Sequence, residues 1–451
     1  MSDASNPRDF DAMLAQARHL LSQTRNDEAY AAYVKILNLA PLNRTVLHEL
    51  GAFAYADGYR SAARTVYAQI VRNWPDDVAG RVNLGLIFYE DGDLAAARTH
   101  FEAVLKIDPA SADAHRGLGR IFCDAGDSEN ADWHWRKSFA EQAVVPQRYR
   151  GKEPAIPVLL LVSTKGGNIP THNILDDRVF AVTALYAEYY RPNFPLPPHT
   201  IIFNAIGDAD FCPDALDAAE RIVDRAGTKI INAPALVHTT GRAANAARLA
   251  DVPGVRAPHI KELRRADIDG TKDMKFPLLL RSKGFHTGQH FVRVESTEEL
   301  RAAAAELPGD ILLAIEYLDA RGSDGMARKY RVMYIGGELY PIHLAISAGW
   351  KVHYFTADMA ENAAYREEER KFLEDMAMAL GAPAVAALTR IGEKLGLDYC
   401  GIDFALDHDG RVIVFEANAT MVINPPPPEP IWDYRRAPIA RALNAARELL
   451  R

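Results

Sequence analysis

The chain has 451 residues, of which 48% are hydrophobic and 25% charged. This ordinary composition excludes a mostly disordered, collagen-like or disulfide-scaffold protein. The formal net charge of −8 argues against binding to nucleic acid or to an anionic membrane through overall charge. At roughly 100–200 residues per domain, the length predicts two to four domains.

The N-terminus lacks the basic and then apolar pattern of a signal peptide, and no run approaches the ~18 apolar residues of a membrane span. The three cysteines, Cys123, Cys212 and Cys400, are far apart and form no zinc or redox motif. We therefore expect a soluble, cytoplasmic protein with no membrane partner and no nucleic-acid partner.

A 34-residue repeat runs through the N-terminal third of the chain. It combines Leu-Gly pairs, alanines, aromatic residues and prolines: Leu50-Gly51, Leu84-Gly85, Leu118-Gly119; Ala63, Ala97, Ala131; Tyr67, Phe101, Trp135; Pro41, Pro75, Pro109. This spacing predicts one helical hairpin per repeat. The small residue lets two helices approach, the aromatic residue fills the space between hairpins, and the proline ends the second helix.

The repeat resembles the tetratricopeptide repeat (TPR), with about four units over residues 10–145. The resemblance implies an all-α superhelix. It leaves open whether the array binds a peptide or protein partner or packs against the rest of the chain.

Strands and helices alternate in the next part of the chain, residues 153–254. Strands are predicted at residues 157–163, 200–203 and 229–232, and helices at 177–189 and 213–226. Strands separated by helices indicate a parallel α/β sheet, and ligands of such sheets lie beyond the carboxyl ends of the strands. The loop at residues 164–168 lies at such an end.

The last part, residues 255–451, has an α+β pattern with antiparallel hairpins. Strands are predicted at residues 277–281, 311–318, 329–335, 399–406 and 411–417, and helices at 298–305, 361–379 and 382–395.

One hairpin carries two carboxylates and an amide. Pairing of residue 403 with residue 414 would put Asp403, Glu416 and Asn418 on one face, with Asp403 and Glu416 as diagonal neighbours. Buried like charges need a neutralising cation, and a set of oxygen ligands favours Mg²⁺ over zinc. The alternative is that one carboxylate pairs with an arginine and the other faces solvent.

A glycine-containing loop at residues 282–290 connects two predicted strands, with Arg281 and Lys283 at its start. Its backbone N–H groups and these cations suit phosphates, although a plain hairpin tip explains the pattern as well. Neither a P-loop nor a Gly-x-Gly-x-x-Gly motif is present.

The order of these segments resembles the ATP-grasp superfamily, especially D-alanine–D-alanine ligase, glutathione synthetase and glutamate ligases. Its most specific part is the Asp403…Glu416-x-Asn418 element. The resemblance implies an α/β pre-ATP-grasp domain at residues 153–254 and an α+β ATP-grasp domain at residues 255–451. The latter would divide into a central subdomain at about 255–318 and a C-terminal subdomain at about 319–451.

The resemblance also implies roles for individual residues. Asp403, Glu416 and Asn418 would hold one or two Mg²⁺ ions, or Mn²⁺, and Glu316, Tyr317 and Leu318 would receive the adenine of ATP. Asp319 or Asp324 would hold the ribose. Arg331 and Arg281 would be the catalytic residues, and Arg331 would stabilise the transferred phosphate or a substrate carboxylate. The remaining nucleotide-binding residues would be Arg242, Arg281, Ser282, Lys283, Gly284 and Gly288, with Arg242 and Arg281 in place of the family's lysines.

The implied activity is an ATP- and Mg²⁺-dependent ligase that joins an unknown carboxylate to an amine or thiol through an acylphosphate. The TPR array would recruit a peptide or protein. Two alternatives are a kinase of the same fold and a TPR scaffold with a weak nucleotide site. His343, Lys351, His353 and Tyr354 are further candidates for an acceptor pocket, with a core or surface position as the simpler interpretation.

Overall fold

The computed structural model describes residues 7–23, 25–141, 143–151, 154–270, 274–283, 289–352 and 357–451. The chain divides into two compact units, residues 1–141 and 142–451. In the part that the structure describes, no helix combines the length and apolar character needed to cross a membrane.

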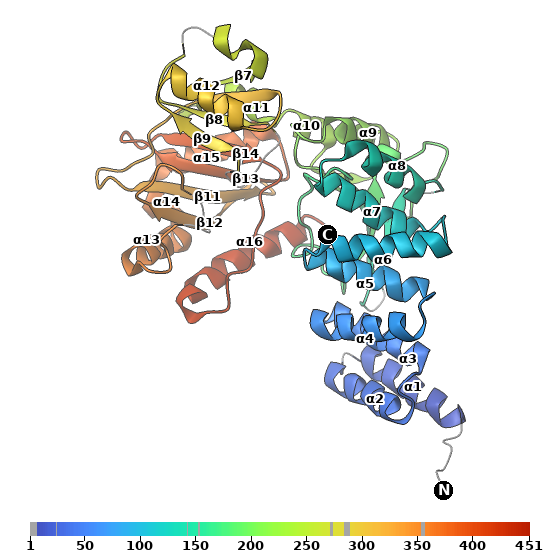
Figure 1. Cartoon of the computed structure of the whole chain (residues 1–451). Helices are drawn as coiled ribbons and strands as arrows, with labels where there is room; N and C mark the ends of the chain where they lie inside the picture. Colours follow the sequence, from blue (N-terminus) through green and yellow to red (C-terminus); the bar gives the residue numbers. More distant parts are fainter. Residues whose placement is uncertain are drawn as a thin grey trace. The chain divides into compact units, whose positions relative to one another are not determined.

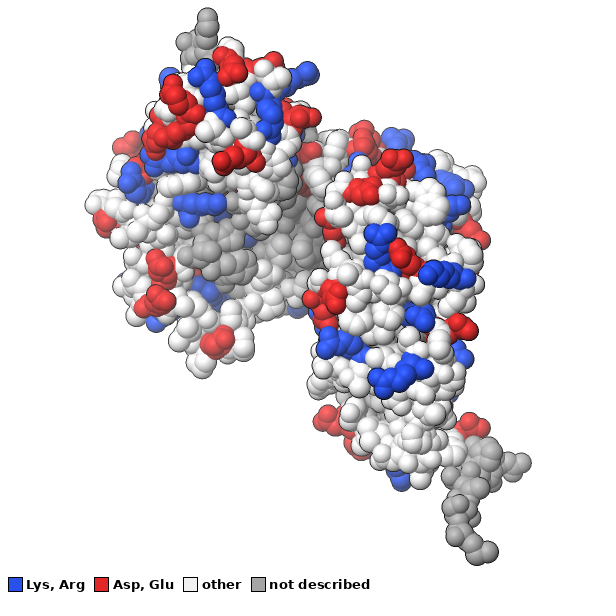
Figure 2. Space-filling model, viewed as in Figure 1, with Lys and Arg blue, Asp and Glu red and all other residues white. Residues whose placement is uncertain are grey.

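The first unit is built from helical hairpins, as the repeat predicts. Its described residues form α1 (Pro7–Ser22), α2 (Asn26–Leu39), α3 (Arg44–Ala56), α4 (Arg60–Asn73), α5 (Val78–Glu90), α6 (Leu94–Ile107), α7 (Ala112–Asp124) and α8 (Ser128–Ser138). Each odd-numbered helix packs on the helix that follows it (Figure 1). On the face in Figure 2, basic and acidic side chains are interspersed over this unit.

Glycine and aromatic residues of the repeat meet as expected. A Cβ atom at Gly85 would lie 2.9 Å from Phe101 Cε1, and one at Gly119 would lie 2.9 Å from Trp135 Cδ2. Phe101 is fully buried. Larger residues at these glycines would therefore push the aromatic ring out of its place, which confirms the predicted reason for the glycines.

The residues that cap the first helix of the later hairpins recur with the same 34-residue period. Asn43, Asp77 and Ser111 precede α3, α5 and α7, and each side chain accepts a hydrogen bond from a backbone N–H group three residues on. Such caps satisfy donors that the first turn of a helix leaves unpaired.

The second unit begins with a five-stranded sheet in the order β1-β3-β2-β4-β5. The strands are β1 (Val144–Pro146), β2 (Ile156–Val162), β3 (Phe180–Tyr186), β4 (Ile201–Asn204) and β5 (Lys229–Ile231). All but β1 are parallel. The helical elements of this region are η1 (Ala187–Tyr189), α9 (Pro213–Val223), α10 (Pro234–His238) and α11 (Arg242–Leu249).

The prediction of a helix at residues 177–189 is wrong, because this segment contains β3 and the short helix η1. Phe180, Val182 and Tyr186 favour a strand locally. Pairing with β2 on one side and β1 on the other then satisfies the backbone groups.

A four-stranded antiparallel sheet follows, in the order β7-β10-β8-β9. Its strands are β7 (Ile260–Arg264), β8 (Leu278–Ser282), β9 (Phe291–Val294) and β10 (Ile311–Glu316), and α12 (Thr297–Glu306) and η2 (Arg265–Gly270) complete it. A separate hydrophobic core joins this sheet to α12 through Leu280, Leu300 and Leu312.

The third sheet has the order β12-β11-β13-β14-β6. Its strands are β6 (Val255–Arg256), β11 (Ala327–Ile335), β12 (Glu338–Ser347), β13 (Tyr399–Leu406) and β14 (Val412–Asn418). The helices are α13 (Ala363–Glu374), α14 (Met376–Leu380), α15 (Ala382–Leu395), η3 (Pro430–Arg435) and α16 (Arg436–Glu448). One continuous hydrophobic core includes residues of this sheet and of the first sheet.

The helix predicted at residues 361–379 is two helices. Asp375 leaves the helical conformation between α13 and α14, and its side chain accepts a hydrogen bond from the Met378 N–H group. This cap starts a new helix and explains the break.

Candidate functional site

The β13–β14 hairpin places Asp403 and Glu416 directly opposite each other. The expected pairing of residue 403 with residue 414 is wrong, and so is the diagonal arrangement that follows from it. The turn sets Leu406 opposite Val412, one residue away from the expected register, and the register shifts again between Asp403 and Phe404. Phe404 pairs with Val414, so Phe415 is an extra residue on β14. Such a bulge moves the next side chain along the strand, and here it brings the two carboxylates closer together.

These carboxylates belong to a row of polar side chains that crosses four neighbouring strands. Register pairs connect β12, β11, β13 and β14 through His343, Arg331, Asp403 and Glu416, in that order. At 4.7–4.9 Å between strands, the row spans about 14 Å. The third sheet thus presents a line of charged and polar groups on one face.

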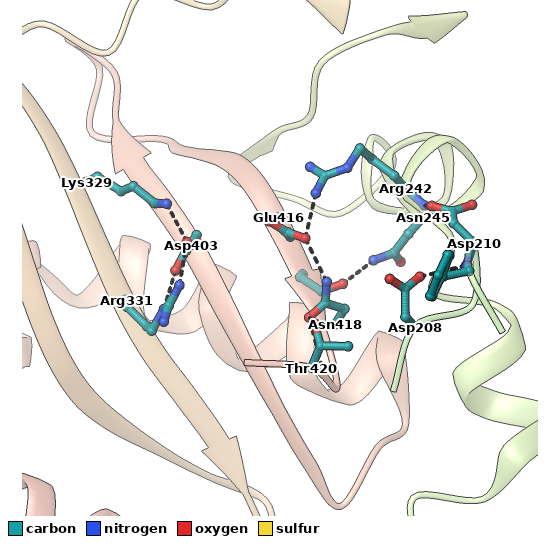
Figure 3. Close-up of polar contacts among 12 residues, drawn as sticks. Asp208, Asp210, Arg242, Asn245, Lys329, Arg331, Asp403, Glu416, Asn418 and Thr420 are labelled. Carbon is teal, nitrogen blue, oxygen red and sulfur yellow. Dashed lines mark hydrogen bonds and ion pairs between the residues drawn. The ribbon is translucent and has the colours of Figure 1, made fainter. Parts of the chain in front are cut away.

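Asp403 lies between two cations of β11 (Figure 3). Arg331 donates from Nε to Oδ1 at 2.6 Å and from Nη2 to Oδ2 at 2.9 Å. Lys329 Nζ lies 2.6 Å from Oδ2. Asp403 is only 1% exposed. Although burial opposes ionisation, Arg331 and Lys329 hold the pKa of Asp403 well below its usual range.

Glu416 pairs with a cation from outside the sheet. Arg242, the first residue of α11, donates from Nη2 to Glu416 Oε1 at 2.6 Å (Figure 3). Asn418 Nδ2 donates to the same oxygen at 2.9 Å. Against the effect of burial, Arg242 and then Arg281 lower the pKa of Glu416 to about 2. The protein's own cations therefore neutralise both carboxylates.

Arg281, at the end of β8, adds another cation. Its side chain is buried, with the guanidinium carbon 5.5 Å from the centre of the Phe291 ring. Burial and, secondly, the charge of Arg242 lower the pKa of Arg281 to about 10. Arg281 is still charged at neutral pH.

These groups line a cavity of about 490 Å³. Nine of the residues to which the family resemblance gives a role line it: Arg242, Arg281, Glu316, Tyr317, Leu318, Asp319, Arg331, Asp403 and Glu416. Among the described lining residues are seven arginines and lysines and four carboxylates, so the wall carries an excess of positive charge. Gly167 and Asn168, from the loop after β2, also line the cavity.

The segment after β10 forms another part of the wall. Glu316 is the last residue of β10, and its Oε2 accepts a hydrogen bond from the His259 N–H group at 3.0 Å. The Tyr317 ring lies against Arg293, with 4.3 Å between the guanidinium carbon and the ring centre. Leu318 is buried, whereas Asp319 pairs with Arg321.

Other predicted residues have different positions. Ser282 and Asn418 line a second pocket of about 40 Å³, which shares Arg242, Arg281 and Glu416 with the larger cavity. Lys283 pairs with Glu262 at 2.7 Å. Asp324 pairs with Arg328 and is not among the residues that line either pocket.

Gly284, Gly288, His353 and Tyr354 lie outside the described residues. His343 and Lys351 do line the large cavity.

Three charged lining residues, Arg321, Lys329 and Arg435, were not selected from the sequence. Lys329 precedes Arg331 by two residues on β11, and strand periodicity alone would have placed both on one face. Arg435 is buried and pairs with the fully buried Glu369 at 2.6 Å. No comparable pattern in the sequence identifies Arg435.

A magnesium ion at this place would have to compete with contacts that the protein already makes. Asp403 and Glu416 pair with cations, and Asn418 Oδ1 accepts hydrogen bonds from the Thr420 N–H and hydroxyl groups. Two opposed carboxylates and an amide are oxygen donors that Mg²⁺ accepts. In the described part of the chain, no three His, Cys, Asp or Glu residues form a metal-binding group, so an ion here would also use Asn418 or ligand oxygens. Glu416 keeps a quarter of its side chain exposed. Asp403 would have to exchange contacts with Lys329 or Arg331.

Comparisons with known proteins concern the helical repeats. A family model described as tetratricopeptide repeat matches residues 52–112 and 92–133. No curated protein matches the chain.

Two solved structures illustrate the structural likeness. MamA from Desulfovibrio magneticus RS-1 is 21% identical over 30% of this chain and 76% of that chain, with a TM-score of 0.27. A tetratricopeptide repeat protein from Parabacteroides merdae is 18% identical over 30% of this chain and 54% of that chain, with a TM-score of 0.29. Together with the helical hairpins, the family match shows that the N-terminal unit contains tetratricopeptide repeats.

Proposed function

We propose that this chain binds ATP and a divalent cation in the 490 Å³ cavity and uses the ATP to activate a carboxylate. An amine, or less often a thiol, then displaces the phosphate. The protein would thus be a carboxylate–amine ligase of the ATP-grasp type.

The observation that carries this proposal is the meeting of three kinds of group in one cavity. The segment from Glu316 to Asp319 gives one wall, the carboxylates of β13 and β14 another, and arginines from α11, β8 and β11 a third. The cavity volume lies within the roughly 300–1,000 Å³ typical of small-molecule sites.

The charge of the cavity favours a polyanion. Arg242 and Arg281 come from different elements yet both lie close enough to Glu416 to lower its pKa. Fixed positive charge of this kind attracts phosphate groups and stabilises the charge that spreads over a transferring phosphoryl group. A divalent cation, when bound, would supply further positive charge to the phosphates.

In this proposal, other residues of the cavity wall contact the nucleotide base and the acid substrate. Apolar side chains of Ile315, Leu318 and Phe415 line the cavity and offer contacts for a nucleotide base. Arg331 lies in the row beside Asp403, and in this proposal it would orient an acid substrate's carboxylate. An enclosed site would also protect an acylphosphate from water.

The TPR array has a separate role in this proposal. TPR repeats indicate a possible protein partner. We propose that they recruit a peptide or protein that serves as the substrate or delivers it.

Nucleotide binding is tested first, by thermal unfolding of the full chain with Mg²⁺ and a non-hydrolysable ATP analogue. Ligand at one hundred times its dissociation constant should stabilise the protein by roughly 2.7 kcal/mol. The Glu416→Gln variant should lose most of this stabilisation. Glu374→Gln, at an exposed position with 57% of its side chain accessible, is the matched control. No shift in the wild type at millimolar nucleotide would contradict both ligase and kinase and favour the scaffold.

The reaction class is tested with hydroxylamine, which traps acylphosphates as hydroxamates. A panel of carboxylic acids should give ADP and hydroxamate in equal amounts. ADP release with a stable phosphorylated product and no hydroxamate would indicate the kinase instead.

A further inference from the structure

Lys329 is a cation of the cavity that the family resemblance does not assign. It lies on β11 two residues before Arg331, so the two side chains share one face of the sheet. Both reach Asp403, and both line the cavity (Figure 3).

Arg331 already neutralises the carboxylate of Asp403, and Lys329 contacts the same carboxylate as a second cation. Arg331 alone engages both oxygens of Asp403 in a two-pronged pair. One guanidinium in this geometry satisfies one carboxylate. Lys329 therefore brings a surplus positive charge to the cavity, and 19% of its side chain is accessible.

Lys329 also differs from the nearby arginines in its freedom to move. Arg242 is tied to Glu416, and Arg281 is buried beside Phe291. Lysine carries a compact charge on a flexible four-carbon chain, and it binds phosphate as a point charge. Among these cations, Lys329 is the one best able to change partners.

We propose that Lys329 is a phosphate-binding residue that exchanges Asp403 for the phosphates of the nucleotide. When its ammonium group moves to phosphate oxygens, an oxygen of Asp403 becomes accessible to a divalent cation. The proposal rests on the proposed function, because it assumes that a nucleotide binds in this cavity. It adds the residue that couples nucleotide binding to metal binding.

The alternative is a fixed counter-ion that only neutralises Asp403. The two roles make different predictions for a neutral residue at position 329. Loss of a phosphate ligand weakens ATP binding, whereas removal of a competitor for Asp403 strengthens binding of a divalent cation alone. A fixed counter-ion acts on ATP only through the general positive charge of the cavity, so its loss should weaken ATP binding by much less than tenfold, and the effect should disappear at high salt.

The experiment compares wild type, Lys329→Met and Lys329→Arg as full chains. Calorimetry measures ATP binding without divalent cation, and the electron paramagnetic resonance signal of free Mn²⁺ measures binding of Mn²⁺ alone. Lys329→Met should weaken ATP binding about tenfold or more, as expected for one charge-assisted hydrogen bond. It should also tighten Mn²⁺ binding, and Lys329→Arg should restore much of the ATP affinity.

Lys371→Met, on α13 with 69% of the side chain accessible, is the matched control and should change neither affinity. If Lys329→Met does not fold, Lys329→Gln takes its place. The proposal for Lys329 would be overturned by equal ATP affinity in the wild type and the neutral variant, or by weaker Mn²⁺ binding in the variant. Neither result would refute the proposed function. Absence of ATP binding in the wild type, with and without Mn²⁺, would instead refute the proposed function.

Discussion

Replacing Asp403 by asparagine is the most direct test of the charge balance in the row of polar side chains on the third sheet. The change keeps the shape of the side chain but removes a negative charge that is 1% exposed and contacts two cations at 2.6–2.9 Å. Arg331 and Lys329 would then face each other across a neutral amide. Breaking a buried ion pair by removing one partner costs about 3–5 kcal/mol.

We expect the lower end of this range, about 3 kcal/mol, because 19–23% of the Lys329 and Arg331 side chains remain accessible. At roughly 2.1 cal/mol/K of unfolding entropy per residue, a unit spanning residues 142–451 should lose about 5 °C in melting temperature. Calorimetry of the full chain measures the shift, and hydrogen exchange in peptides from β11 and β13 assigns it to this unit.

The matched control is Asp409→Asn in the turn of the same hairpin. Asp409 has 77% of its side chain exposed, so its loss should cost under about 0.5 kcal/mol. A decrease of less than 1 °C for Asp403→Asn, equal to that of the control, would refute the reasoning. It would mean that the cations around Asp403 are solvated or neutralised in another way.

Two further predictions concern the helical repeats. Burial and then the charges of His115 and Arg98 lower the pKa of His134 to about 4, so its neutral form stabilises the fold above pH 6.5 and this stability is lost as the pH falls toward 4. Allowing for screening by water, the loss should be about 1–2 kcal/mol. Burial also lowers the pKa values of His115 and His100, so the difference between circular dichroism melts at pH 7 and 4.5 should be smaller in His134→Gln than in the wild type, and an equal difference would contradict this role of His134. Gly119→Val should destabilise the repeats by about 1–3 kcal/mol, because its Cβ would lie 2.9 Å from the Trp135 ring; an unchanged urea midpoint would contradict this packing.

Local patterns explain why much of the fold could be predicted. Gly85, Gly119 and their aromatic partners recur every 34 residues because each repeat makes the same contacts within its hairpin and with the next one. The β13–β14 hairpin follows from two apolar runs around a turn at residues 407–410. The hairpin pattern pointed to Asp403 and Glu416, whereas Arg242 and the segment from Glu316 to Asp319 were selected through the family resemblance, since no local pattern connects Arg242 to Glu416.

Pairing between distant segments decided the rest. Residues 180–186 became a strand because β1 and β2 lie on either side, and the bulge at Phe415 set Glu416 opposite Asp403. The repeats and the hairpin follow from local sequence, because they depend on contacts between residues that are close along the chain. The balance of Arg331, Lys329 and Arg242 against the two carboxylates does not, because long-range charge pairing depends on strand register and on the position of α11.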